Sequence, residues 1–273
     1  MAVITISRQV AALGDEVALA VAKKLNYKFV DRKEIEKRIV DLGFPESKLS
    51  KYDERKPGFF ASLAKDRDEY MDYLATAVIE AAAEGNTVLI GRGSHIILET
   101  LPNLVSIRLV AKEEIRMERL KKEFDWNDKQ AKQRIDESHN NRLGFHKSFF
   151  NRENDDAEDY NVVINTGILG VEEASDVIVA ATKSLITPEK EKKSADKIKC
   201  LLIAQNLVNT LVFKYKLNIN FLHAVAEGNT VTLQGVADSS AIVEKAIVLS
   251  QKELSDFKIE SAISVVQDFK AYP

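Results

Sequence analysis

Short, uninterrupted runs of apolar residues alternate with longer amphipathic segments through the first part of the chain. The runs lie at Val3–Ile6, Val88–Ile90, Val105–Val110 and Val162–Ile164. Apolar runs of this length, without polar alternation, are typical of strands that are buried on both faces of a parallel sheet. The pattern therefore predicts an α/β fold in which a three-layer, doubly wound parallel sheet is covered by helices.

The segments between these runs have the spacing of helices with one buried face. Val17, Val21 and Leu25 share one face of a helix, and Leu74 and Val78 share a face of another. Apolar residues three or four positions apart form such a stripe, which a helix buries against a sheet. The helices are thus expected to connect successive strands of the sheet.

The pattern changes after residue 186. Residues 187–195 contain a proline and alternating charges with almost no apolar side chain, which predicts a linker. A helical segment, two strand-like runs, a second helix and a last run follow, and Gly235 within one run indicates a bulge or a close backbone approach. We predict a first domain over 1–186 and a small α+β domain over 196–273.

Composition narrows the functional classes. The 273 residues are 45% hydrophobic and 30% charged, with a formal net charge of -3, so the basic surplus typical of nucleic-acid binding is missing. The chain shows neither a signal peptide nor an apolar run of membrane-spanning length, and we expect a cytoplasmic protein. The single cysteine cannot form an internal disulfide, and the histidines lack metal-ligand spacing, so no protein-held metal site is predicted.

The segment from Ile4 to Leu25 has the strand, turn and helix order of a phosphate-binding loop. In such loops glycines let backbone N–H groups turn toward the phosphate, and a basic side chain completes the site. Here the connecting residues 8–14 read RQVAALG, in which Gly14 is the only glycine. Asp15 follows it and places a negative charge where a phosphate would approach.

Several motifs resemble the cytidylate-kinase-like family of phosphate-loop nucleotide kinases. Residues 4–8 (ITISR) match the family's first strand, although the family has Gly-Ser-Gly in place of residues 11–13 and a basic residue in place of Asp15. Residues 27–32 (YKFVDR), 88–94 (VLIGRGS) and 160–167 (YNVVINTG) match its later blocks. The helix from Asp128 to Asn141 and the turn after it resemble the family's lid. The resemblance covers residues 1–185.

The resemblance implies a site for ATP with magnesium and for a nucleoside monophosphate. It assigns the acceptor phosphate to Arg92 with Gly93 and Asp31, and it assigns the lid contacts to Arg142 and Asp136. Ser7 or Asp31 would contact the metal and its waters. The donor loop would comprise Ser7, Arg8, Ala11, Gly14 and Asp15.

Structural roles compete with these assignments. Asp15 would also serve as the N-cap of a helix that has no ligand, and Arg92 would also form an ion pair at a strand end. Glycines on both sides of Arg92 favour a ligand there. Solvent-exposed positions are expected for Arg116, Arg119, His139 and His146.

Residues 196–273 resemble a BON domain, a small binding module. The match rests on the spacing of Val231, Leu233 and Gly235, followed by Asp238-Ser239 and an apolar helix. It implies a binding role for this domain, with a partner or small ligand that the sequence does not identify.

Two functions therefore remain open. The first is phosphoryl transfer from ATP to a nucleoside monophosphate, a reaction that depends on neutralising phosphate charge. The second is a non-catalytic, kinase-like regulator that senses a ligand through its BON-like module or forms a homodimer. The loss of the loop glycines motivates the second hypothesis.

Overall fold

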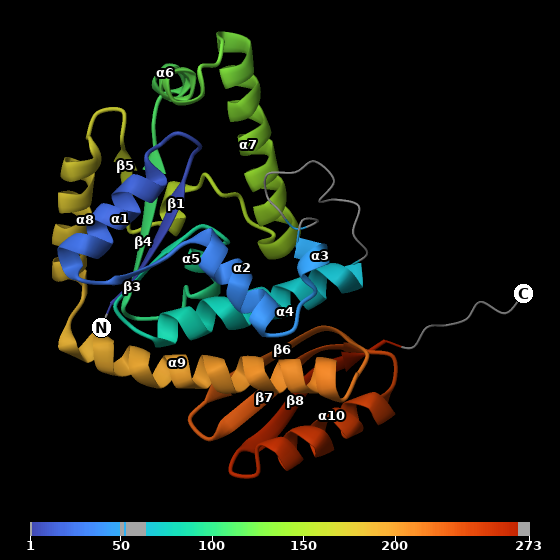
Figure 1. Cartoon of the computed structure of the whole chain (residues 1–273). Helices are drawn as coiled ribbons and strands as arrows, with labels where there is room; N and C mark the ends of the chain where they lie inside the picture. Colours follow the sequence, from blue (N-terminus) through green and yellow to red (C-terminus); the bar gives the residue numbers. More distant parts are fainter. Residues whose placement is uncertain (1, 50–51, 53–63, 267–273) are drawn as a thin grey trace, which may run out of the picture. The chain divides into compact units, whose positions relative to one another are not determined.

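The computed structural model describes residues 2–49, 52 and 64–266 (Figure 1). Two compact units divide the chain, Met1–Ala195 and Asp196–Pro273. The first unit contains β1 (Val3–Arg8), α1 (Gly14–Leu25), β2 (Lys28–Val30), α2 (Arg32–Asp41), α3 (Glu46–Leu49), α4 (Ala64–Ala83), β3 (Thr87–Ile90), α5 (Ser94–Ile97), β4 (Leu104–Val110), α6 (Glu113–Phe124), α7 (Asp128–Phe150), a 3-10 turn at Ala157–Asp159, β5 (Val162–Asn165) and α8 (Val171–Leu185).

Five parallel strands form the sheet of the first unit, in the order β2-β3-β1-β4-β5. Every residue of β3 is buried, and β1 and β4 are buried over most of their length. The predicted doubly wound parallel sheet is confirmed. Burial is incomplete at the two outer strands, β2, where Lys28 is exposed, and β5, where Val163 is 44% exposed.

Helices cover both faces of this sheet (Figure 1). On one face α1 packs beside α8, and apolar side chains from both helices meet those of β1, β3 and β4 in one core. On the other face α5 contacts β1 and α4. Each fully buried valine or isoleucine in such a core stabilises the fold by about 1.5–3 kcal/mol. Because β1, β3 and β4 are parallel, their carboxyl ends lie at the same edge of the sheet. Parallel α/β sheets bind their ligands at this edge.

The predicted lid is longer than expected. α7 does not end at Asn141 but continues through Gly144 to Phe150, where Asn151 closes it in a left-handed conformation. A glycine inside a helix costs about 1 kcal/mol. The aromatic contacts beyond it offset that cost, because the ring of Phe149 lies 4.8 Å from that of Phe145 and 5.6 Å from that of Tyr70.

The predicted linker at 187–195 is wrong, since α9 (Pro188–Asn209) begins within it. Proline is compatible with the first turn of a helix, and the Thr187 hydroxyl accepts a hydrogen bond from the Lys190 N–H at 3.3 Å. Glu189 and Lys193, one helical turn apart, form an ion pair at 2.7 Å. The alternating charges that suggested a linker therefore support a helix.

The second unit is a small α+β structure. After α9 come a π-helical turn at Thr210–Lys214, β6 (Ile219–Glu227), β7 (Thr230–Ala237), α10 (Ser240–Glu253) and β8 (Lys258–Val265). β7 pairs with β6 in the antiparallel and with β8 in the parallel direction. The irregularity predicted at Gly235 lies opposite it, since the register of β6 shifts between Asn220 and His223. Over the described residues, the structure contains no helix of the length and apolarity needed to cross a membrane.

Candidate functional site

The loop between β1 and α1 keeps a left-handed backbone without the glycines that favour it. Ala11 has φ 57° and Leu13 has φ 56°, and these are the two positions at which the resembling family has glycine. A left-handed residue other than glycine costs roughly 1–2 kcal/mol. The conformation of the loop must therefore be held by contacts from outside it.

Two side chains supply these contacts by binding loop carbonyl groups. Nη1 of Arg119, on α6, donates to the carbonyl of Ala11 at 2.9 Å, and the Thr166 hydroxyl donates to the carbonyl of Ala12 at 3.1 Å. Nη2 of Arg119 also donates to the carbonyl of Thr166 at 2.6 Å. Arg119 thus joins the loop to the end of β5.

The expectation that Arg116 and Arg119 lie on a solvated helix face is wrong. Arg116 is 9% exposed, and its Nε donates to the carbonyl of Ala111 at 3.0 Å. Burial lowers the pKa of both guanidinium groups from the ordinary value. Their position one and two turns into the helix after β4 was the sequence signal for a role at the strand end.

Arg8 lies between the first turn of α1 and the turn after β3. A Cβ atom on Gly14 would lie 2.5 Å from Cγ of Arg8, and one on Gly91 would lie 2.5 Å from its Nη1. Arg8 itself is buried. Gly14 therefore serves to make room for this arginine, not to supply a left-handed turn.

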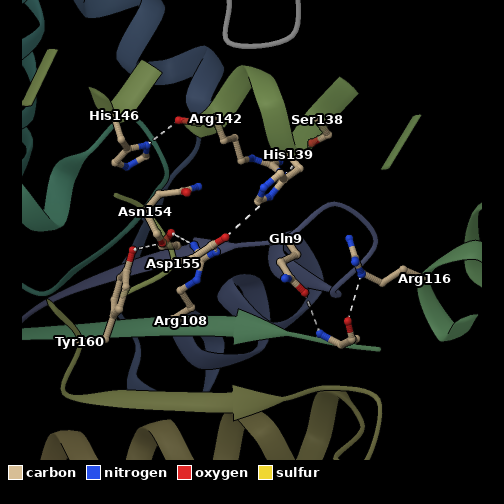
Figure 2. A network of polar contacts seen from close by, with 12 residues as sticks. Gln9, Arg108, Arg116, Ser138, His139, Arg142, His146, Asn154, Asp155 and Tyr160 are labelled. Atoms are coloured by element: carbon tan, nitrogen blue, oxygen red, sulfur yellow. Dashed lines mark hydrogen bonds and ion pairs between the residues drawn. The ribbon is translucent and has the colours of Figure 1, made fainter. Parts of the chain in front are cut away.

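A cavity of about 280 Å³ opens beside the loop, at the carboxyl edge of the sheet and against α7 (Figure 2). Four arginines line it, together with three carboxylates, one histidine and four uncharged residues. They are Arg8, Arg108, Arg116, Arg142, Glu113, Asp136, Asp155, His139, Gln9, Val10, Ile135 and Asn154.

Arg108 on β4 is the buried centre of the polar network in Figure 2. Its Nη1 donates to the Ser7 hydroxyl at 2.9 Å, and its Nη2 forms an ion pair with Asp155. The other oxygen of Asp155 lies 3.6 Å from Nδ1 of His139, on α7. Asp155 thus bridges the sheet edge and the lid helix. Arg108 was absent from the predicted site, although a lone charge inside an apolar strand is a signal that could have found it.

Arg142 and Asp136, both on α7, line the cavity. Nη1 of Arg142 donates to the Ser138 hydroxyl at 2.8 Å. Asp136 is exposed and forms an ion pair with Lys132 at 2.9 Å, and Lys132 is equally close to Glu113. Two of the three carboxylates of the cavity therefore share one lysine, which offsets one of their two negative charges.

Two histidines are buried near the cavity. His146, expected at the surface, is 5% exposed, and its Nδ1 lies 2.9 Å from the carbonyl of Arg142. The ring of His95 stacks on that of Tyr160 with centroids 4.8 Å apart. Burial, followed by the charges of His146, Arg108 and Arg152, lowers the pKa of His95 to about 3. His95 is therefore neutral at physiological pH.

Arg92 does not line this cavity but forms a structural ion pair beside it. Its side chain is 2% exposed, its Nη2 pairs with Glu36 on α2, and its Nη1 donates to the carbonyl of Tyr52 at 3.0 Å. Glu36 also accepts a hydrogen bond from Nε of Arg32 at 2.7 Å. The turn that carries Arg92 is left-handed at residues 91, 92 and 93.

Two of the three predicted aspartates, Asp15 and Asp31, do not line the cavity. Asp31 caps α2 by accepting a hydrogen bond from the Glu34 N–H at 2.8 Å. Asp15 is exposed in the first turn of α1, but the N-cap position belongs to Leu13, so the N-cap role expected for Asp15 is wrong.

A narrow crevice beside the cavity is lined by Ser7, Arg8, Arg92, Gly93 and Arg142. Within the described ranges, no group of three histidine, cysteine or acidic side chains is placed to hold a metal ion.

The fold and this strand-end site define a parallel α/β domain of the phosphate-loop kinase class. The sequence matches the cytidylate kinase-like family over residues 3–168, and the chain belongs to that family. This confirms the family resemblance over those residues.

Solved structures are similar to this chain over about two thirds of its length. An uncharacterized protein from Eubacterium ventriosum is 20% identical with a TM-score of 0.55, and the match covers 67% of this chain and 98% of that one. A shikimate kinase from Bacteroides thetaiotaomicron is 15% identical with a TM-score of 0.41, over 67% and 97% of the two chains. A gluconokinase from Sinorhizobium meliloti is 16% identical with a TM-score of 0.42, over 67% and 95%. A comparison with curated proteins finds no match.

Proposed function

We propose that the first unit binds the phosphate groups of a nucleotide in the arginine-lined cavity, as a kinase-like binding domain with weak or no phosphoryl transfer. The observation that carries this proposal is the convergence of four arginines on one cavity beside the β1–α1 loop. Guanidinium groups bind phosphate oxygens with paired N–H donors and stay charged when buried.

The charges of the cavity favour an anion. Glu113 and Asp136 both pair with Lys132, and Asp155 pairs with Arg108. Four arginines and Lys132 against three carboxylates leave a net charge of +2 around the cavity. In a partly buried site such charges act more strongly than in water, because the surroundings screen them less.

The size of the cavity favours the phosphate chain over the whole nucleotide. Pockets that enclose a complete small ligand usually have about 300–1,000 Å³. The cavity has about 280 Å³. It is therefore large enough for the phosphates and lies just below the usual range for a complete ligand.

The loop argues against fast phosphoryl transfer. Asp15 occupies the first turn of α1 where the family has a basic residue, and like charges about 4 Å apart repel by roughly 1–4 kcal/mol between bulk water and a partly buried site. Nη1 of Arg108 donates to the hydroxyl of Ser7, so a magnesium ion bound at this hydroxyl would lie next to a positive guanidinium group.

A second candidate function is phosphoryl transfer from ATP with magnesium to a nucleoside monophosphate. The left-handed backbone at Ala11 and Leu13 favours it, because the loop keeps the conformation that glycine would give. In this case Arg8 and Gly14 would face the donor phosphates, and Arg142 with Asp136 would act from the lid.

Calorimetry tests the proposal with matched variants of the lid helix. ATP with magnesium should bind the full chain with one site, and R142M should weaken binding at least tenfold. R134M, on the same helix but outside the cavity, should leave it unchanged. No binding of ATP at millimolar concentration to the folded protein would refute the proposal.

Turnover separates the two candidates. ADP formation is measured after CMP is added to the ATP complex. The binding proposal expects a rate far below the roughly 1–100 s⁻¹ that is usual for kinases. A rate within that range would establish phosphoryl transfer instead.

We also propose that the second unit is the binding module implied by the BON-like resemblance. Its order of helix, strand, strand, helix and strand supports this interpretation. Calorimetric titration of ATP into the full chain and into residues 1–195 tests whether the second unit contributes to ATP binding. Equal affinities are expected if the second unit binds a different ligand.

A further inference from the structure

A single carboxylate holds two arginines next to the cavity. Oε1 of Glu36, on α2, accepts from Nη2 of Arg92 and from Nε of Arg32, the latter at 2.7 Å. The Arg92 side chain is 2% exposed, whereas those of Arg32 and Glu36 are 19% and 23% exposed. Glu36 therefore offsets part of the positive charge of the two arginines from within the chain.

The position of this ion pair suits an anion from solution. Arg92 follows β3 at the carboxyl edge of the sheet, in a turn of three left-handed residues. It lines the same crevice as Arg8 and Arg142, and both of these arginines also line the cavity proposed for the phosphate chain. A second phosphate bound by Arg92 would thus lie beside the first ligand.

A carboxylate and a phosphate present similar oxygens to a guanidinium group, which binds either of them through paired N–H donors. Glu36 already supplies this oxygen. An incoming phosphate would have to displace Glu36 from two arginines and would then lie near its negative charge. Both effects oppose binding.

We propose that Glu36 occupies the second anion position of the domain and restricts the site to one phosphate-bearing ligand, excluding a phosphate monoester such as a nucleoside monophosphate. This rests on the proposed function of the neighbouring cavity. Glu36 is then a specificity-determining residue, and removal of its charge should open the second position.

Calorimetric titration of CMP into the full chain tests this inference. The wild-type protein should show no CMP binding at millimolar concentration. E36Q, which keeps the size of the side chain but removes its charge, should bind CMP at least tenfold more tightly, and R92M combined with E36Q should abolish the gain. E34Q is the matched control on the same helix, because Glu34 pairs with Arg38 and Lys28 and not with Arg92.

The outcomes are distinct. Equal CMP affinity of the wild-type protein and E36Q would overturn the inference, as would tight CMP binding to the wild-type protein. If circular dichroism shows that E36Q does not fold, E36D is titrated instead. Its shorter side chain moves the carboxylate away from Arg92. ATP is titrated into the same samples. If ATP does not bind the wild-type protein, the cavity proposal is refuted. If ATP binds but E36Q has the same CMP affinity as the wild-type protein, only the role of Glu36 is refuted.

Discussion

Replacement of Ala11 and Ala12 by glycine should have opposite effects on stability, although the two alanines are neighbours in one loop. Ala11 is left-handed, with φ 57°, whereas Ala12 lies outside the left-handed region and is fully buried. A11G removes a backbone cost of roughly 1–2 kcal/mol. Two effects oppose this gain. Glycine raises the entropy of the unfolded chain, which costs about 0.4–1 kcal/mol of stability, and the methyl group of Ala11 no longer packs against Leu120, Ala131 and Ile135. The expected result is a gain of up to about 1 kcal/mol.

A12G relieves no strain. It removes a methyl group from the core, worth about 0.8 kcal/mol, and it carries the same entropic cost as A11G. The expected loss is about 1–2 kcal/mol, so the two variants should differ by about 2 kcal/mol. Urea unfolding followed by circular dichroism measures this difference. Equal destabilisation by both substitutions would show that Ala11 carries no strain in the folded loop.

Three further predictions concern the same edge of the sheet. D155N should raise ATP affinity about threefold to tenfold in calorimetry because it frees Arg108, and an unchanged affinity would mean that the carboxylate does not compete with the ligand. R119M should destabilise the fold by about 2 kcal/mol in urea through loss of charged hydrogen bonds to two carbonyls, and R119K should restore only part of it because lysine lacks the planar fork. The pKa of His95 is about 3 when folded and 6.5 when free, so the unfolded chain binds the extra proton between these values and stability falls as pH falls through that window. The loss should be about 2 kcal/mol between pH 7 and pH 5, and H95Q should show a smaller pH dependence if this histidine is responsible.

Local patterns were sufficient for most of the sheet and its helices. The apolar runs at Val3–Ile6 and Val105–Val110 form β1 and β4, because a strand buried on both faces tolerates few polar residues. The errors lie where charge patterns have two structural solutions. Residues 187–195 have the charges of a solvated linker, but their spacing of opposite charges also supports the first turns of α9.

The candidate site was less predictable, because its contacts join residues that are far apart in the sequence. Arg108 contacts Ser7 and Asp155, which precede and follow it by about a hundred and about fifty positions. Arg92 was correctly placed at a strand end, but its partner Glu36 is 56 positions away and lies on another helix. A pattern within one segment shows which residue is charged, whereas only the fold shows which charge neutralises it.

The contact between the β1–α1 loop and the α6–α7 hairpin contains an intrinsic fluorescent probe. Trp126, the only tryptophan of the chain, packs with Val10, Ala11 and Met117 against a cluster formed by Leu120, Ala131 and Ile135. Its ring stacks on Phe124 with centroids 4.6 Å apart. The indole therefore lies where the β1–α1 loop meets the α6–α7 hairpin. Any ligand that alters the packing between loop and hairpin will change the polarity around this one fluorophore, and its emission can be followed in the unmodified protein.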